Sequence, residues 1–212
     1  MIYLVSRVAW FLFAFVTPWE DVMKWSRSAA LAFAVCLAVS CSRAPQLDQR
    51  IMEMVSVHNQ HDVEKELSFY TDDATFVISG EQPVIGKAAL RELFASDAAA
   101  GSEIAYAGMV VSGDTASAES VSEKSELLLL MGVPVLHWKP GSKNIFKNGL
   151  IYRVELTPIE DKDAEIYKKT SADFMKWLAV VHPERVPEFQ STTHSVKSVK
   201  AWVEMLREWR AQ

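Results

Sequence analysis

His137 is the side chain of this sequence best suited to acid–base chemistry. It stands beside Trp138, at the end of an extended segment and just before a Pro-Gly turn. A histidine titrates near neutral pH, so His137 is a candidate general acid or base if it faces a pocket. The competing interpretation is a surface histidine or a hydrogen-bonded core histidine.

Two other groups of polar residues have a structural interpretation beside the chemical one. His58, His61 and Asp62 have the spacing of metal ligands on a helix face, but the polar residues between them interrupt the helix and favour a loop. Asp72 and Asp73 could form a carboxylate pair with one raised pKa, but a turn between helix and strand is the favoured interpretation. Since the sequence contains no phosphate-binding Gly-rich loop, serine elbow or Cys–His pair, we predict no metal and no cofactor.

The composition limits the classes of partner. The chain has 212 residues, half of them hydrophobic, and a formal net charge of -5. This hydrophobic content is enough for a folded core, and the acidic balance lacks the basic surface that a phosphate backbone requires. We therefore predict a folded protein that binds no nucleic acid.

Residues 23–41 have the three-part layout of an export signal. Lys24 and Arg27 form a basic start, Ala29–Val39 is apolar, and small residues lead to Cys41. The apolar part is shorter than the roughly 20 residues that span a bilayer. The end of this stretch resembles a bacterial lipobox, which implies a lipid on Cys41, attachment to a membrane, and a cell-envelope lipoprotein that faces the periplasm in a Gram-negative cell. The alternatives are an ordinary cleaved signal and an uncleaved anchor.

This interpretation divides the start of the chain. Residues 1–40 are the predicted export segment, and 41–46 are a polar, Pro-containing tether. We expect translation to start at Met23. If it starts at Met1, residues 1–22 form an interfacial segment.

The rest of the chain first shows a helical and then a strand-like pattern. Apolar periodicity predicts a helix of about three turns from Leu47 and a second helix that Asp62 caps and that includes Tyr70. A strand over Ala74–Ile78 and a helix that begins at Gly86 follow. The strands predicted after them are Ile104–Ser112, Thr115–Leu130, Val133–Trp138, Asn144–Lys147 and Leu150–Leu156.

These elements predict an α+β fold with a mostly antiparallel sheet of four to six strands and helices on one of its faces. Two helices follow Pro158, one ending before His182 and one running from Val196 to Trp209. The run Leu127–Met131 is apolar on both faces of its predicted strand. It is either buried beneath the C-terminal helices or part of a homodimer interface on the sheet.

The order of several short motifs resembles the nuclear transport factor 2-like (NTF2-like) superfamily, which includes the SnoaL-like cyclases and the ketosteroid isomerases. The motifs are Asn59 with Asp62, Leu67–Tyr70, Asp72–Phe76, Gly86, Gly113–Ala116, and Phe146 with Asn148–Ile151. The resemblance implies a cone-shaped half-barrel, a curved sheet around N-terminal helices with an apolar pocket. The corresponding domain is 47–158, and 159–212 is a C-terminal helical extension.

The sequence departs from the isomerase pattern at the positions that the resemblance identifies. Ile78 replaces the general base, Met54 replaces the tyrosine of the oxyanion site, and the late carboxylic acid falls near Ser142 or Asn144. We therefore expect no isomerase catalysis of that type. The predicted pocket-lining residues are Met54, Ile78, His137, Trp138 and Asn144.

Together these observations predict an exported, lipid-anchored protein that binds a small apolar molecule or a protein partner. The alternative is a SnoaL-like enzyme, such as a cyclase, dehydratase or isomerase, with His137 as its acid or base. A third prediction is a structural module that dimerises through its sheet.

Overall fold

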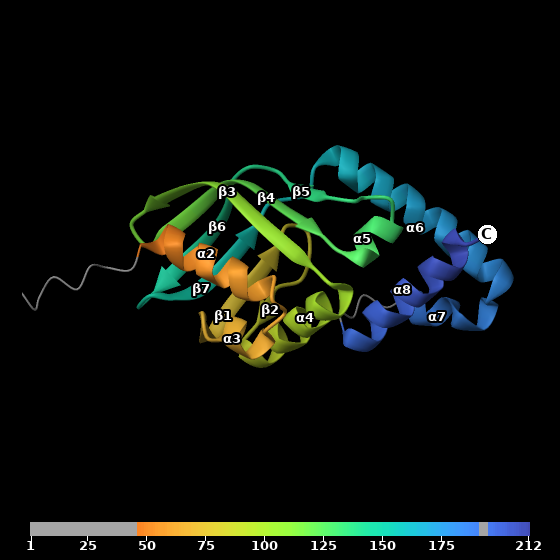
Figure 1. The fold of residues 1–212 in the computed structure, drawn as a ribbon, viewed down its shortest axis with the longest axis horizontal. Coiled ribbons are helices and arrows are strands. Elements are labelled where there is room, and N and C mark those ends of the chain that lie inside the picture. Colours follow the sequence, from red (N-terminus) through yellow and green to blue (C-terminus); the bar gives the residue numbers. More distant parts are fainter. Residues whose placement is uncertain (1–45, 191–194) are drawn as a thin grey trace, which may run out of the picture. The chain divides into compact units, whose positions relative to one another are not determined.

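The computed structural model describes residues 46–190 and 195–212 (Figure 1). The predicted export segment, Cys41 and nearly all of the tether lie outside these residues. None of the described helices is long and apolar enough to cross a membrane. The described helices are α2 (Leu47–His58), α3 (Val63–Leu67), α4 (Lys87–Ala100), α5 (Glu126–Leu130), α6 (Asp161–Val181), α7 (Val186–Phe189) and α8 (Val196–Arg210), with a short 3₁₀ turn (Pro183–Arg185) before α7.

The strands form one curved, open sheet in the order β2-β1-β7-β6-β4-β3, with β5 paired to β4. Pairing is antiparallel except between β1 and β7, which run parallel. This arrangement confirms the predicted α+β class. The strands are β1 (Tyr70–Ile78), β2 (Val84–Ile85), β3 (Glu103–Ser112), β4 (Thr115–Lys124), β5 (Leu136–Trp138), β6 (Ser142–Lys147) and β7 (Leu150–Leu156).

Two local features shape this sheet. Asn148 and Gly149 take φ values of 53° and 77°, the left-handed pair that a tight hairpin between β6 and β7 requires. Gly108 in β3 has φ 63°, and a Cβ there would lie 2.5 Å from Oε2 of Glu119 on β4. Only glycine therefore fits at this position, and the kink it allows bends the sheet.

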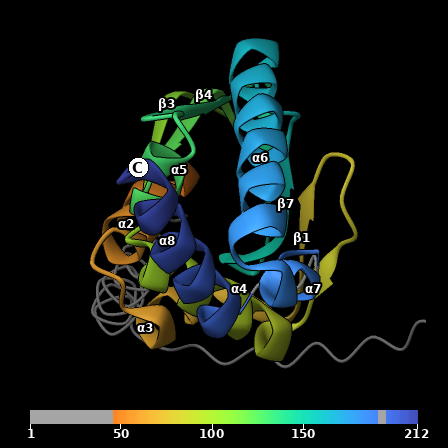
Figure 2. The same cartoon turned by 90° about the vertical axis from the view of Figure 1, so that its right-hand side faces the viewer.

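The main core lies between the sheet and the helices α2 and α4. Ile51, Leu90, Ala116 and Ile151 are fully buried in it, one each from α2, α4, β4 and β7. Figure 1 shows α2 lying across the sheet, and Figure 2 shows α4 at one end of it. The apolar stripes predicted on the two helices are the faces that this core buries.

The C-terminal extension has a core of its own. Phe174 of α6 is fully buried against the rings of Trp177, Phe189, Trp202 and Trp209. Helix α8 packs against α4 and α5, so the extension and the sheet belong to one compact unit (Figure 2).

Three predicted elements differ from those observed. The sheet has seven strands rather than four to six, because two- and three-residue strands join at its margins. Strand β1 begins at Tyr70, so Tyr70 lies in a strand and not on a helix face. The predicted strand to Leu130 ends at Lys124, because the Ser125 hydroxyl accepts a hydrogen bond from the amide of Leu128 and caps α5.

The run Leu127–Met131 is therefore largely helical rather than part of the sheet surface. Leu128 and Met131 are buried, and α5 packs against α8. Of the two predicted roles for this run, burial beneath the C-terminal helices is the one observed.

Candidate functional site

A cavity of about 330 Å³ opens between the sheet, the three helices α2, α3 and α4, and the C-terminal extension. Most of its lining is aliphatic or aromatic. Ile159, Tyr167 of α6 and Val199 of α8 contribute to it, so the extension forms part of the wall. A cavity of this size and character is suited to a small organic molecule.

A group of polar side chains lines one region of this cavity. They come from five segments that the fold brings together: the end of α2, α3, the second half of α4, the α4–β3 connection, and the end of β4. We call this group the polar cluster, and its members are His58, Glu66, Asp97, Ser102 and Glu123.

A chain of hydrogen bonds runs through the polar cluster. His58 Nδ1 lies 3.0 Å from Glu66 Oε1, and both side chains are buried. Ser102 Oγ donates to Glu123 Oε1 at 2.7 Å and lies 3.5 Å from His58 Nε2. Because Ser102 gives its only hydrogen to Glu123, its oxygen is left to accept from His58. His58 then donates from both ring nitrogens, as an imidazolium does.

The charges around His58 agree with this assignment. Burial alone would lower the pKa of His58, but the hydrogen bond and the charge of Glu66 outweigh burial, and Asp97 and Glu123 add to their effect. The net result is a raised pKa. The surroundings of His58 therefore favour its cationic form.

The pKa values of Asp97 and Glu123 are also raised, which for an acid favours the neutral form. Burial, followed by the charge of Glu123, raises the pKa of Asp97 to about 8. Burial also raises the pKa of Glu123, although the hydrogen bond from Ser102 and the charge of His58 oppose it. The pair therefore keeps a proton at neutral pH.

Two phenols from the sheet, those of Tyr70 and Tyr106, add to the polar part of the cavity. Burial and the charge of Glu66 raise the pKa of Tyr70 well above its usual value. Burial raises the pKa of Tyr106 to about 12, against the opposing effect of Asn144. Both hydroxyl groups therefore stay protonated at neutral pH and can donate hydrogen bonds.

Three of the five predicted pocket residues line the cavity, namely Met54, Ile78 and Trp138. Asn144 is completely buried behind the lining, where it acts on the Tyr106 hydroxyl. His137 does not belong to the lining among the described residues, although its neighbours Leu136 and Trp138 do. Side chains alternate between the two faces of a strand, so an inward Trp138 requires an outward His137.

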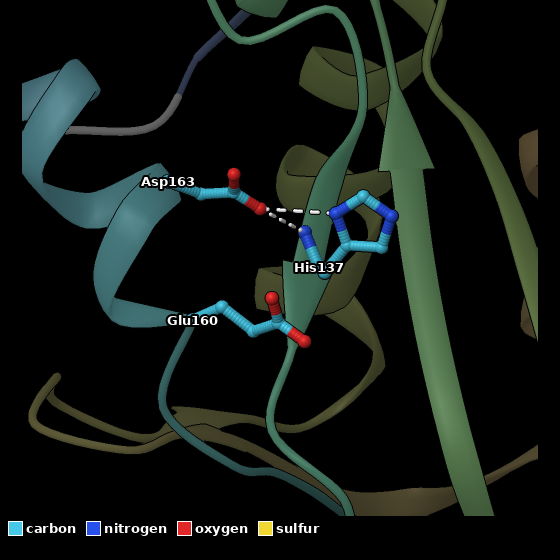
Figure 3. A group of neighbouring side chains, drawn as sticks. All are labelled: His137, Glu160 and Asp163. Atoms are coloured by element: carbon cyan, nitrogen blue, oxygen red, sulfur yellow. Dashed lines mark hydrogen bonds and ion pairs between the residues drawn. The ribbon is translucent and has the colours of Figure 1, made fainter.

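His137 instead joins β5 to the start of α6 (Figure 3). Asp163 Oδ2 accepts hydrogen bonds from the backbone amide of His137 at 2.9 Å and from its Nδ1 at 3.0 Å. The amide of Glu160 donates to the carbonyl of His137 at 2.8 Å. We call His137 and Asp163 the outer pair. The prediction that His137 acts as acid or base in the pocket is therefore corrected.

The side chains of His137, Glu160 and Asp163 offer ligand atoms within 4.8 Å of one another, which is close enough for a metal ion. However, Asp163 Oδ2 already accepts two hydrogen bonds, and Glu160 Oε2 pairs with Lys162 Nζ at 3.0 Å. These contacts indicate that the group has a structural role and connects β5 to the start of α6.

The loop interpretation of His58, His61 and Asp62 holds for two of the three. His61 is exposed in the turn after α2, and Asp62 caps α3 through the amide of Lys65. His58 is instead the last residue of α2 and is buried in the polar cluster. The spacing Ile51, Met54, His58 places it on the apolar stripe, and a polar residue at such a position is the signal that could have identified it.

No protein-family model and no curated protein matches the sequence. Solved structures do match, and their names agree with the predicted resemblance. The matched structures include an NTF2-like protein.

One match is SalBIII, an epoxide hydrolase/cyclase-like enzyme with a role in pyran ring formation in the polyether salinomycin, at 18% identity and a TM-score of 0.48; the match covers 55% of this chain and 92% of that one. A second is an NTF2-like protein of unknown function from Cytophaga hutchinsonii, at 8% identity and a TM-score of 0.44, covering 55% and 91%. A third, from Kribbella flavida, is described as a candidate ketosteroid isomerase, at 16% identity and a TM-score of 0.43, covering 53% and 76%.

Proposed function

We propose that this protein binds a small, largely apolar molecule in its cavity. The observation that carries the proposal is the cavity of about 330 Å³ with apolar walls and one polar region. Apolar walls favour a hydrocarbon body, whereas the polar cluster fixes its orientation through a few directed contacts. The His137 side chain is not among the described residues that line this cavity.

A cavity-filling variant tests the proposal. Val121 lines the cavity and is 3% exposed, so Val121→Phe would place a ring in the space for the ligand. Val110→Phe is the matched control, because Val110 on β3 is 59% exposed. With the neutral dye N-phenyl-1-naphthylamine, we expect at least a tenfold loss of affinity in Val121→Phe and none in Val110→Phe. Equal affinity in the two variants would place the dye elsewhere and contradict the proposal.

We also propose export and attachment to the cell-envelope membrane through a lipidated Cys41. The support is the signal-like layout of residues 23–41. Metabolic labelling with an alkynyl fatty acid, compared between wild type and Cys41→Ala, tests this. Label on the wild type alone supports a lipoprotein. Equal labelling of both proteins, or no labelling, contradicts a lipid anchor on Cys41.

A second candidate function is acid–base catalysis in the same cavity, as a SnoaL-like enzyme of the cyclase, dehydratase or isomerase kind. It is favoured by the raised pKa of Asp97, because a carboxyl group that titrates near pH 8 can give and take a proton at neutral pH. We expect wild type, but not Asp97→Asn, to exchange the α-protons of 2-tetralone in deuterated water. Proton NMR measures this exchange, and equal rates would exclude Asp97 as the base.

The predicted homodimer through the sheet remains a proposal. Because the run Leu127–Met131 packs within the chain, such a dimer would use other residues of the sheet. Light scattering across a concentration series tests it, and a monomer at all concentrations contradicts it.

A further inference from the structure

The charged side chains that line the cavity are strongly biased toward acids. Glu66, Asp97 and Glu123 belong to the polar cluster, and Glu81 lines the cavity as well. His58 is the one basic group, since no lysine or arginine of the described residues contributes to the lining. An enclosed space with this balance attracts positive charge.

The carboxyl groups of the cluster differ in the partners they have. Glu66 is paired with His58, and Glu123 accepts a hydrogen bond from Ser102. The carboxyl group of Asp97 makes no hydrogen bond or ion pair with any described residue, and the half-buried side chain borders the cavity. A carboxylate that is largely withdrawn from water and has no partner is costly, so a ligand that pairs with Asp97 would stabilise the fold.

The walls of the cavity are rich in aromatic rings. Tyr70 and Phe94 lie with their ring centroids 5.3 Å apart, and Phe76 packs edge-on against Phe94 at 6.4 Å. Tyr106 and Trp138 also line the cavity. The faces of such rings attract cations, particularly where water is excluded.

We propose that the ligand of the cavity is an organic cation, an apolar amine or quaternary ammonium compound, whose charged head lies against Asp97 and Glu123. Its hydrocarbon part lies against the aromatic and aliphatic walls. This inference rests on the proposed ligand-binding function and names the chemical class of the ligand.

Binding of a cation is coupled to the protons of the cluster. The titratable groups that act on Asp97 are Glu123 from β4, His58 from α2 and Glu66 from α3, and Asp97 in turn acts on Tyr70. A cation binds the ionised form of the carboxyl group best, so its binding releases the proton that Asp97 holds in the free protein. Affinity for a cation of fixed charge therefore rises with pH as Asp97 ionises, by up to about tenfold per pH unit below the pKa.

Two probes of matched shape separate charge from size. Benzyltrimethylammonium carries a permanent positive charge, and neopentylbenzene replaces its nitrogen by carbon. Both are measured by calorimetry on the full chain at pH 6 and pH 8. We expect the cation to bind at least tenfold more tightly than the neutral probe at pH 8, and to lose at least tenfold in affinity at pH 6.

Substitutions then assign the effect to Asp97. Asp97→Asn should weaken the cation about tenfold and leave the neutral probe unchanged. Glu92→Gln, on the same helix but exposed to solvent, should change neither affinity. Glu123→Gln is a second test within the cluster and should also weaken the cation. Thermal unfolding confirms that each variant is folded.

The possible failures are distinguishable. If neopentylbenzene binds as tightly as the cation and neither cluster variant alters the ratio, the ligand is not a cation, while the cavity remains a binding site. If neither probe nor the naphthylamine dye binds the folded protein, the proposed function fails together with this inference.

Discussion

Two of the histidine–carboxylate pairs among the described residues have the same separation and different surroundings. In the polar cluster, His58 lies 3.0 Å from Glu66, and their side chains are 6% and 4% exposed. In the outer pair, His137 lies 3.0 Å from Asp163, but the imidazole is 36% exposed. The first pair belongs to a larger set of buried ionisable groups around a cavity, whereas the second connects a strand to a helix.

The comparison shows that residue type and hydrogen-bond length do not identify a functional histidine. Desolvation and the number of neighbouring charges separate the two pairs. His58 responds to three carboxyl groups, and its protonation is coupled to theirs. His137 makes its contacts with one carboxylate and the adjoining backbone.

The largest difference between the pairs should appear when Glu66 is changed to Gln. This leaves the His58 imidazolium buried without its counter-charge, and we expect a loss of about 3 kcal/mol in the free energy of unfolding. Urea denaturation at pH 6 measures it. The double variant His58→Leu/Glu66→Leu should recover much of the loss, because it removes both charges. A loss below about 0.5 kcal/mol in Glu66→Gln would contradict a strong buried pair.

The pH dependence of stability gives the next largest effect. The pKa of Asp97 is raised from 3.8 to about 8, so between these values the folded state holds a proton that the unfolded state has lost. Stability then falls as pH rises. The raised pKa of His58 acts in the same direction, because its contribution is complete below pH 6.5 and is lost as pH rises through the folded value.

We expect the free energy of unfolding to decrease by on the order of 1 kcal/mol for each pH unit between pH 5 and pH 8. Asp97→Asn should flatten this slope, and Asp163→Asn should leave it unchanged. Urea denaturation at one-unit pH intervals measures both. If wild type and Asp97→Asn have the same slope, Asp97 is not the cause of the pH dependence of stability.

The outer pair should give a smaller loss of stability. Asp163→Asn keeps one oxygen acceptor but weakens two hydrogen bonds to His137 and removes a negative charge near the start of α6, so we expect about 1 kcal/mol. Denaturation at pH 7 measures it. A loss equal to that of Glu66→Gln would remove the distinction between the pairs.

The smallest expected effect is that of His137→Gln on ligand binding. Because the His137 side chain does not line the cavity, the affinity for N-phenyl-1-naphthylamine should change less than twofold. A tenfold change would give His137 a role in the site that its position on β5 does not explain.

The elements with strong local signals were predictable from the sequence. Asp62 caps a helix, and the pairs Gly113–Asp114 and Asn148–Gly149 are hairpin turns, since each depends on neighbouring residues alone. The parallel pairing of β1 with β7 joins residues more than seventy positions apart and has no local signature. The helix α5 was missed because a short run of leucines fits a buried strand as well as a helix.

The site was only partly predictable. His58 and Asp97 each continue an apolar stripe at helical spacing, Asp97 after Leu90 and Phe94, so the pattern predicts that both side chains face inward. The inward position of Glu123 could not be predicted in this way. The buried positions of β4 change from even to odd numbers between Ala118 and Val121, opposite Gly108. Simple alternation fails across such a change.

One part of the cavity wall is encoded by a stretch of the chain separate from the one that encodes the polar cluster. The cluster comes from residues 58–123, whereas Ile159, Tyr167 and Val199 come from the extension with its own aromatic core. Substitutions in the C-terminal extension can therefore reshape the space for the hydrocarbon part of a ligand without disturbing the polar cluster that holds the charged part. During divergence, ligand size and ligand charge can be selected independently. Exchanging the extension between related proteins should transfer the preference for ligand size and leave the preference for ligand charge unchanged.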